Sequence, residues 1–266
     1  MACQGQVFRP RHRGGYPINT PSPLKACWAF EFRDQKSSQH QIVTMSSSSA
    51  VLAASIGSAI LYGTLVRSRP SRWRMVVKTA STAMLSAATA MRGGSLLLVG
   101  ALALGATGDA FLAWDDEASF LRGLGSFLVA HILYIAAFVQ HDSDGLNLEV
   151  LLSGWRAVAA GALALLAPAM IASLLPRIGR ELRPPVVVYS LTIFVMALAA
   201  LTLDSSQVIT GAIMFTGSDS ILAADRFLVS PTASYRPWMQ HAVWVFYYVG
   251  QLLIAMGFLS LEVDAP

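Results

Sequence analysis

Long apolar runs separated by short polar connections make up most of the chain after about residue 45. Each run has roughly 17–21 residues, enough for an α-helix to cross the hydrocarbon core of a bilayer. Backbone groups in lipid must hydrogen-bond within their own segment, so we expect these runs to be helices. The pattern predicts an all-α fold, a polytopic membrane bundle of about eight transmembrane helices. The predicted spans are 49–66, 75–91, 95–114, 123–140, 154–174, 185–203, 208–224 and 242–261.

Composition supports a membrane protein rather than a soluble domain. Hydrophobic residues make up 55% of the chain and charged residues 13%, whereas soluble domains carry about 25% charged residues. Both cysteines, Cys3 and Cys27, precede the apolar runs, so the helical part has no disulfide framework and no cysteine metal site. The net charge of +4 is not gathered into a basic stripe with aromatic residues, which argues against a nucleic-acid partner.

Residues 1–45 differ from the rest of the chain. They are rich in Arg, Lys and Pro and poor in acids, a composition that does not bury a core. We therefore predict two parts, a disordered basic tail over 1–45 and a transmembrane helical domain over 46–266. The tail is either dispensable, with a start at Met45, or an Arg-rich, acid-poor transit peptide.

Two acidic residues interrupt apolar runs. Asp109 lies near the end of the run 96–114, and Asp219 lies in the run 208–224. A carboxylate in hydrocarbon is unfavourable by several kcal/mol unless it faces a polar cavity or is protonated, so each is a candidate functional residue. The alternative is that each carboxyl only hydrogen-bonds a neighbouring helix.

Other polar side chains are expected at a similar depth. At about 1.5 Å of rise per residue, they lie roughly 5–15 Å from the membrane face that carries the odd-numbered connections. This placement predicts a polar pocket that opens to one face. The residues concerned are Lys78, Asp109, His131, Tyr189, Asp219, Tyr247, Tyr248 and Gln251.

The two acids also suggest an internal duplication. The five residues from Asp109 (DAFLA) resemble those from Asp219 (DSILA). Lys78 precedes the first acid by 31 residues, and Tyr189 precedes the second by 30. Helices one to four and five to eight are therefore interpreted as a 4+4 parallel repeat with a site at the interface.

Each supporting residue also has a purely structural interpretation. Lys78 can extend to the interface, and His131 can be a hydrogen-bonded packing histidine. Tyr134 and Tyr248 can belong to an aromatic belt. Ser218, directly before Asp219, offers a small side chain that lets a ligand approach the backbone.

At these residues the sequence resembles the lysoplasmalogenase family of membrane proteins, the YhhN-like family. The resemblance covers residues 78–257, and the order and spacing of several short stretches carry it. One difference is that the family usually has a Lys-Pro pair where this chain has Lys78-Thr79. The matching stretches are Gly108-Asp109, 127–134 (FLVAHILY), Val188-Tyr189 with Met196, Gly211-Ala212 with Phe215, 218–222 (SDSIL), Arg226-Phe227, and Tyr248 with Gln251.

The resemblance implies an ether-bond hydrolase that cleaves the vinyl ether of lysoplasmalogens to a fatty aldehyde and a glycerophospho-alcohol, without a cofactor. Protonation of the vinyl carbon needs a carboxylic acid, and attack by water needs a carboxylate. A buried pair of carboxyls can supply both states. Asp109 and Asp219 would form this pair, in either assignment. His131 and Tyr189 would orient the pair or the water, and Lys78 would meet the lipid phosphate. The supporting set is completed by Tyr134, Ser218, Tyr248 and Gln251.

Two other functions fit the same residues. One is a metal-dependent lipid hydrolase with zinc between His131, Asp109 and Asp219, although zinc usually takes more nitrogen or sulfur ligands. The other is a small proton-coupled transporter that uses the paired acids and the repeat for alternating access. In each case we expect an integral, multi-pass membrane protein, located in the endoplasmic reticulum if the source is eukaryotic.

Overall fold

The computed structural model describes residues 45–141 and 147–264, and within these ranges the chain forms helices and no strands. The all-α prediction is therefore confirmed. The predicted tail lies outside the described residues, except for Met45, where the first described helix begins. That helix spans Met45–Leu65. The others are α2 (Arg72–Met91), α3 (Leu96–Phe111), α4 (Glu117–His141), α5 (Leu148–Leu151), α6 (Gly154–Leu174), α7 (Arg183–Ala200), α8 (Ser206–Phe227) and α9 (Arg236–Asp264).

Each of the eight predicted spans overlaps one long helix of the described chain. Five of these helices are long and apolar enough to cross a membrane, namely the first helix, α4, α6, α7 and α9. α3 is apolar but has only 16 residues, and α2 and α8 carry several charged residues. The chain is thus a multi-pass helical membrane protein, and eight crossings stay a prediction.

Local sequence signals explain where several helices begin and continue. Ser71, Ser95 and Ser205 each accept a hydrogen bond from a backbone N–H in the first turn of α2, α3 and α8, respectively. Such serine caps satisfy donors that would otherwise lack a partner. Two prolines stand in the first turn of α7, where a missing N–H is tolerated. α6 continues through Pro168 as one helix.

The surface of the helices carries many exposed apolar side chains, and several polar side chains are buried beside the apolar core. On α6, Val158 and Leu165 are each 75% exposed, whereas Asp109, His131 and Gln251 are at most 1% exposed. Large exposed apolar faces suit contact with lipid acyl chains. Buried polar side chains in a membrane bundle mark a functional interior.

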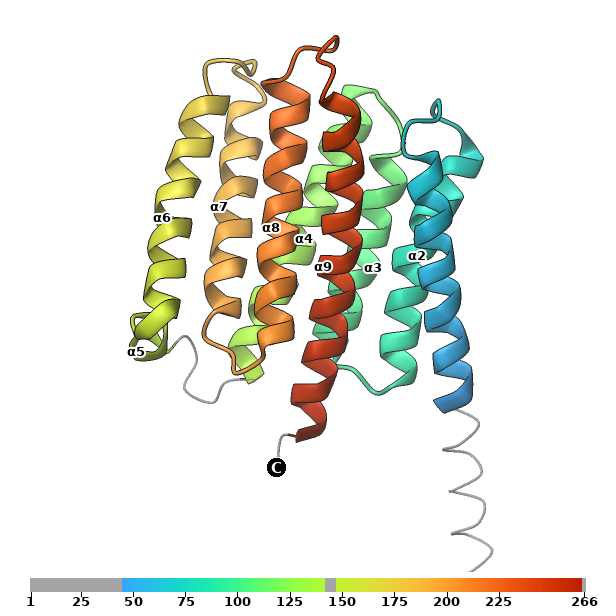
Figure 1. Cartoon of the computed structure of the whole chain (residues 1–266), viewed down its shortest axis with the longest axis vertical. Helices are drawn as coiled ribbons and strands as arrows, with labels where there is room; N and C mark the ends of the chain where they lie inside the picture. Colours follow the sequence, from blue (N-terminus) through green and yellow to red (C-terminus); the bar gives the residue numbers. More distant parts are fainter. Residues whose placement is uncertain (1–44, 142–146, 265–266) are drawn as a thin grey trace, which may run out of the picture. The chain divides into compact units, whose positions relative to one another are not determined.

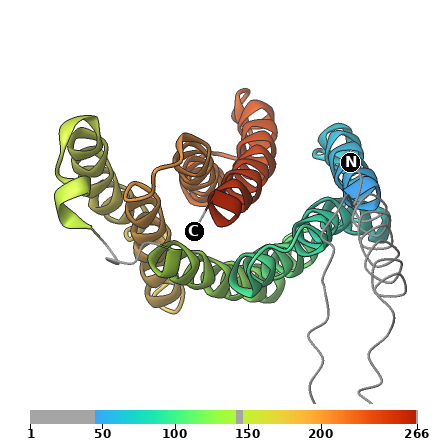
Figure 2. The same cartoon turned by 90° about the horizontal axis from the view of Figure 1, so that it is seen from below.

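Six helices form a closed ring. α2 packs on α3, α3 on α4, α4 on α7, α7 on α8, α8 on α9, and α9 returns to α2. Figure 1 shows these helices standing side by side, and in Figure 2 α8 and α9 lie on the concave side of the row formed by α2, α3 and α4. The first helix joins this ring through Trp244 of α9, whose indole N–H donates to the Ala59 carbonyl at 3.0 Å. The ring determines which side chains can meet inside.

The contact between α8 and α9 is unusually close because glycines face each other across it. A Cβ added at Gly211 would lie 2.7 Å from the Gly250 carbonyl oxygen. A Cβ added at Gly250 would lie 2.9 Å from the Gly211 carbonyl oxygen. Small residues of this kind let helix backbones approach in a membrane, where packing replaces the hydrophobic effect as the main attraction.

Candidate functional site

A cavity of about 270 Å³ lies inside the ring and is lined by side chains from all six of its helices. It contains both Asp109 and Asp219, which come from α3 and α8. The lining extends to the α3–α4 connection through Trp114 and Asp115, and to the start of α9 through Arg236. The sequence-predicted residues Lys78, Tyr189 and Ser218 also line it.

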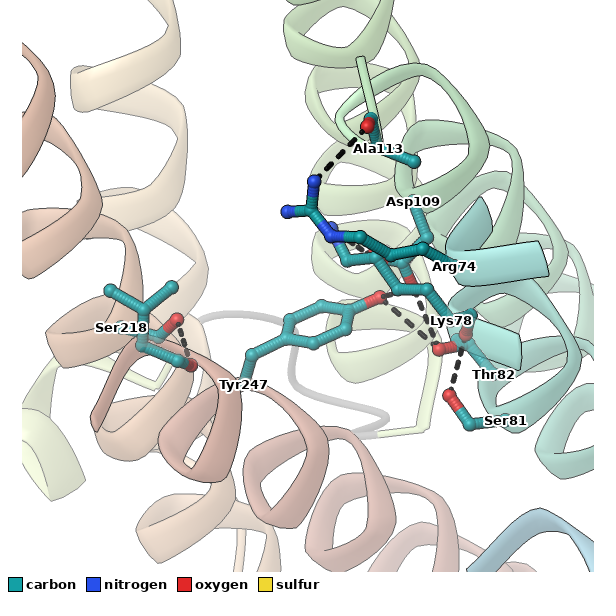
Figure 3. Close-up of polar contacts among 9 residues, drawn as sticks. Arg74, Lys78, Ser81, Thr82, Asp109, Ala113, Ser218 and Tyr247 are labelled. Atoms are coloured by element: carbon teal, nitrogen blue, oxygen red, sulfur yellow. Dashed lines mark hydrogen bonds and ion pairs between the residues drawn. The ribbon is translucent and has the colours of Figure 1, made fainter. Parts of the chain in front are cut away.

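Asp109 is enclosed by donors. Its Oδ1 is 3.2 Å from the Lys78 ammonium, and its side chain is 1% exposed. Its Oδ2 accepts hydrogen bonds of 2.8 Å from the hydroxyls of Thr82 and Tyr247. Figure 3 shows Lys78 and Thr82 beside Asp109, with the Tyr247 ring reaching toward them from the other side of the site. This carboxyl therefore has one cation and two hydroxyl donors.

Helix geometry explains this arrangement. Lys78 and Thr82 are four residues apart on α2, so they share one face of that helix. Tyr247 comes from α9 and crosses to α3 beside Gly105. A Cβ at Gly105 would lie 3.5 Å from the Tyr247 hydroxyl and 3.1 Å from the Gln251 amide nitrogen. The glycine thus leaves room for the side chain that joins α9 to α3.

Asp219 has a simpler environment. The Tyr189 hydroxyl of α7 donates a hydrogen bond to its Oδ2, and Asp219 is a partly exposed residue in the wall of the cavity, whereas Asp109 is buried. The Tyr189 ring meets the His131 ring edge to face, with centroids 5.4 Å apart. The two acids therefore share a cavity but differ in the number and charge of their partners.

His131 lies behind Tyr189 and does not line the cavity. Its Nδ1–H donates to the Phe127 carbonyl at 2.6 Å, and its ring is fully buried. Its Nε2 has no hydrogen-bond partner among the described residues. The predicted contact of His131 with an acid is therefore indirect in this structure, through the tyrosine ring.

The remaining predicted residues have structural partners. Tyr134 donates to the Gln251 amide oxygen, which links α4 to α9. Tyr248 and Ser55 share a hydrogen bond of 2.7 Å, and Ser218 donates to the Val243 carbonyl at 2.9 Å. Of these residues only Ser218 lines the cavity. The contacts bind helices together around the site, and a role of these residues in substrate binding stays a prediction.

Corresponding contacts recur in the two halves of the chain. The Lys78–Asp109 pair joins α2 to α3, and the Tyr189–Asp219 pair joins α7 to α8. In addition, a histidine follows each acid by 22 residues, His131 and His241, and each donates Nδ1–H to the carbonyl four residues earlier. These parallels support the predicted 4+4 repeat.

Comparison with known proteins places these features in a family. The sequence profile of the YhhN family matches residues 73–258, which include α3 to α8 and nearly all of α2. This chain belongs to the YhhN family. Every sequence-predicted site residue lies within the matched region.

Two curated relatives are similar to this YhhN-family chain over much of its length. It is 33% identical over 166 residues to the lysoplasmalogenase of Mycobacterium bovis. The aligned region covers 60% of this chain and 59% of that protein. The chain is 34% identical over 174 residues to lysoplasmalogenase TMEM86B of Homo sapiens. The aligned region covers 64% of this chain and 67% of that protein. The chain thus spans about three fifths of the length of the mycobacterial relative. No solved structure matches it.

The sequence alone did not identify all members of the YhhN-family site. Thr82 is absent from the predicted residues, although its position one turn after Lys78 is a signal for it. The sequence places both Tyr247 and Tyr248 at the right depth, and the predicted site residues include Tyr248 and not Tyr247, whose hydroxyl is the one that contacts Asp109. Adjacent helix residues point about 100° apart, and only the packing of α9 decides which of the two hydroxyls reaches Asp109.

The zinc alternative depends on three ligands meeting at one point. Among the described residues no group of three or more His, Cys, Asp or Glu side chains is arranged to hold a metal ion. His131, one of the three expected ligands, lies outside the cavity lining and packs against Tyr189. The three expected ligands therefore do not meet at one point in the described part of this YhhN-family chain.

Proposed function

We propose that this chain is an integral-membrane hydrolase that cleaves the vinyl ether bond of lysoplasmalogens. The products are a fatty aldehyde and glycerophosphoethanolamine or glycerophosphocholine. Membership of the YhhN family and similarity to proteins named lysoplasmalogenase support the proposal. The observation that carries it is the pair of acids, Asp109 and Asp219, in one cavity with unequal partners.

The unequal partners suggest a division of roles. A cation and two hydroxyl donors stabilise a negative charge on Asp109. Asp219, with a single phenol partner, is the better place for the proton that the pair shares. In the proposal Asp219 is the general acid and Asp109 is the general base.

The proposed reaction has two steps, formation of a hemiacetal and its collapse to aldehyde and alcohol. Asp219 gives its proton to the vinyl carbon remote from oxygen, which produces an oxocarbenium ion stabilised by the negative Asp109. Water adds to the cationic carbon and gives a proton to Asp109, which forms a hemiacetal. In the second step Asp109 protonates the leaving alcohol oxygen while Asp219 accepts the hemiacetal hydroxyl proton. The C–O bond breaks, and both acids regain their starting states.

Cavity size is compatible with this chemistry. At about 270 Å³, the cavity is just below the range of roughly 300–1,000 Å³ that is typical of small-molecule sites. It can hold the vinyl ether, the glycerol and a water molecule, while the rest of the alkenyl chain stays outside in lipid. Trp244, Phe127 and Tyr62 line the cavity and limit access of bulk water to the cation.

The proposal is tested by aldehyde release from purified protein in detergent, with a vinyl-ether lysolipid and its saturated-ether analogue. We expect turnover of the first only. Asp109→Asn and Asp219→Asn should each lose about 100- to 10,000-fold in rate, the usual contribution of general acid–base groups. The rate of each variant is divided by the fraction of its protein that is monodisperse in detergent, which corrects for misfolded protein. Near-normal turnover in both variants would reject the mechanism, and absence of aldehyde from any lysolipid would favour the transporter alternative.

The cellular location is a finer part of the proposal. If the source of the protein is eukaryotic, we propose that the protein resides in the endoplasmic reticulum of its cells. Fractionation of those cells tests this statement, and recovery with mitochondrial or plastid membranes would contradict it.

A further inference from the structure

Four basic side chains line the cavity, and two of them have acid partners. Lys78 is paired with Asp109 at 3.2 Å, and Arg236 is paired with Asp225 at 2.8 Å. Arg74 and Arg226 form no ion pair among the described residues, although both line the cavity. The available positive charge is therefore on these two arginines rather than on Lys78, from which we expected the phosphate contact.

Arg74 has unused hydrogen-bonding capacity. Its Nε is buried and has no partner among the described residues. One terminal nitrogen donates to the Ala113 carbonyl at 3.4 Å, which is a long hydrogen bond. Figure 3 shows the guanidinium of Arg74 beyond Lys78, directed toward Ala113. A buried guanidinium N–H without a partner is unfavourable, so this group is suited to a ligand that supplies oxygen acceptors.

Arg226 is held by an aromatic ring rather than by an acid. Its guanidinium carbon lies 4.2 Å from the centroid of the Phe120 ring. The Phe120 ring also meets Phe227 at right angles, with centroids 5.9 Å apart, which fixes its position. This contact with the ring occupies no N–H hydrogen bond of the guanidinium, and guanidinium N–H groups bind phosphate oxygens well.

The depth of both arginines matches the length of the proposed substrate. Arg74 precedes Lys78 by one helical turn, about 6 Å of rise nearer the membrane face. Arg226 follows Asp219 by two turns, about 10 Å toward the same face. In a lysolipid the vinyl ether oxygen is five bonds from phosphorus, roughly 6 Å when extended at ordinary bond lengths. With the vinyl ether at the acids, the phosphate reaches the level of the arginines.

We infer that Arg74 and Arg226 form a subsite for the phosphodiester of a lysophospholipid headgroup. This inference rests on the proposed function, which supplies the vinyl ether position. The exposed carboxylate of Asp115 lies next to Trp114 in the same lining. An acid and an indole suit the ammonium of ethanolamine or choline. The mouth of the cavity therefore matches a zwitterionic headgroup better than free phosphate.

Binding of a ligand that cannot be hydrolysed tests the subsite. The probe is a 1-alkyl lysophosphocholine, a saturated ether, bound to full-length protein in detergent. Arg74→Gln and Arg226→Gln should each weaken binding about tenfold or more, the effect of losing a hydrogen bond to a charged group. Arg74→Lys should recover part of the loss. The matched control, Arg72→Gln, changes an exposed residue outside the cavity lining on the same helix and should bind normally.

Three comparisons decide the result. A 1-alkylglycerol, which lacks phosphate, should bind equally to wild type and to both Gln variants; an equal loss for this ligand would overturn the inference, as would unchanged binding of the phosphocholine probe. Inorganic phosphate at the concentration of the bound probe should not displace it, and full displacement would assign the subsite to free phosphate instead. Since the probe is not turned over, failure of the hydrolase proposal shows as missing aldehyde with normal, arginine-dependent binding.

Discussion

The two halves of this molecule place an aspartate at corresponding positions and give it different surroundings. Asp109 in the first half has an ammonium and two hydroxyls within hydrogen-bonding distance. Asp219 in the second half has one phenol and a partly exposed position in the cavity wall. α2 supplies a lysine to one acid and α7 supplies a tyrosine to the other, so the two acids differ in character. Catalysis by a pair of carboxyls needs such inequality.

The largest effect in this comparison is expected when both acids are given a cationic partner. Tyr189→Lys places an ammonium next to Asp219, as Lys78 is placed next to Asp109. A cation at this position favours the ionised carboxylate, so the proposed general acid would be lost and aldehyde release should fall about a hundredfold or more. Tyr189→Met is the control, since it removes the hydroxyl without adding charge and should fall much less. Equal losses in the two variants would show that charge next to Asp219 is not the determinant.

The two acids should also differ in their contribution to stability. Asp109→Asn leaves the Lys78 ammonium, 11% exposed, without its counter-charge. We expect a loss of about 2–3 kcal/mol in the free energy of unfolding, below the value for a fully dry pair because Lys78 lines the cavity. Asp219→Asn replaces a carboxyl that the proposal holds protonated with a neutral amide that can still accept the Tyr189 hydrogen bond, so the loss should be below about 1 kcal/mol. Thermal unfolding in detergent measures both, and the opposite order would contradict the assigned environments.

A smaller change is expected at the hydroxyl that joins the two halves. Tyr247→Phe removes the 2.8 Å hydrogen bond to Asp109 and leaves Lys78 and Thr82 in place. Turnover should fall about tenfold, the effect of one hydrogen bond to a charged group. Tyr235→Phe is the matched control, because Tyr235 is exposed in the α8–α9 connection and does not line the cavity. Equal rates for Tyr247→Phe and wild type would remove Tyr247 from the site.

The smallest effect is expected at Asp116. Its carboxylate is exposed and lies outside the cavity lining, so it serves as a reference for the two carboxyls of the cavity. Asp116 precedes α4, where the hydroxyl and backbone N–H of Ser119 hold the pKa of Asp116 below its ordinary value of 3.8. Its contribution to stability is present above that ordinary value and is lost as the pH falls through the lower folded-state pKa. Asp116→Asn should therefore lower the unfolding temperature slightly at about pH 6, and the difference should shrink at about pH 3. A difference that grows on acidification would contradict this direction.

Hydropathy alone predicted the helices, because lipid allows few alternatives to an α-helix for a long apolar run. The positions of Asp109 and Asp219 were predicted for the same reason, since an acid in such a run stands out. The Lys78–Asp109 pair could not be derived, because helical depth does not fix the rotation of α2 relative to α3. The role of Arg74 was hidden too, since a basic residue near a span end looks like any interfacial arginine until its neighbours are known.

The glycine contact between α8 and α9 has a mechanical consequence. α9 carries Tyr247, which holds Asp109, and α8 carries Asp219. Because the backbones of α8 and α9 meet at Gly211 and Gly250 with no space for a methyl group, we expect the two helices to move together. The hydrogen bond from Tyr247 to Asp109 links this helix pair to α3, so we expect the α8–α9 backbone contact to influence the spacing of the two carboxyls. We therefore expect a bulkier residue at either glycine to change that spacing and to lower turnover, although neither glycine belongs to the proposed acid–base pair.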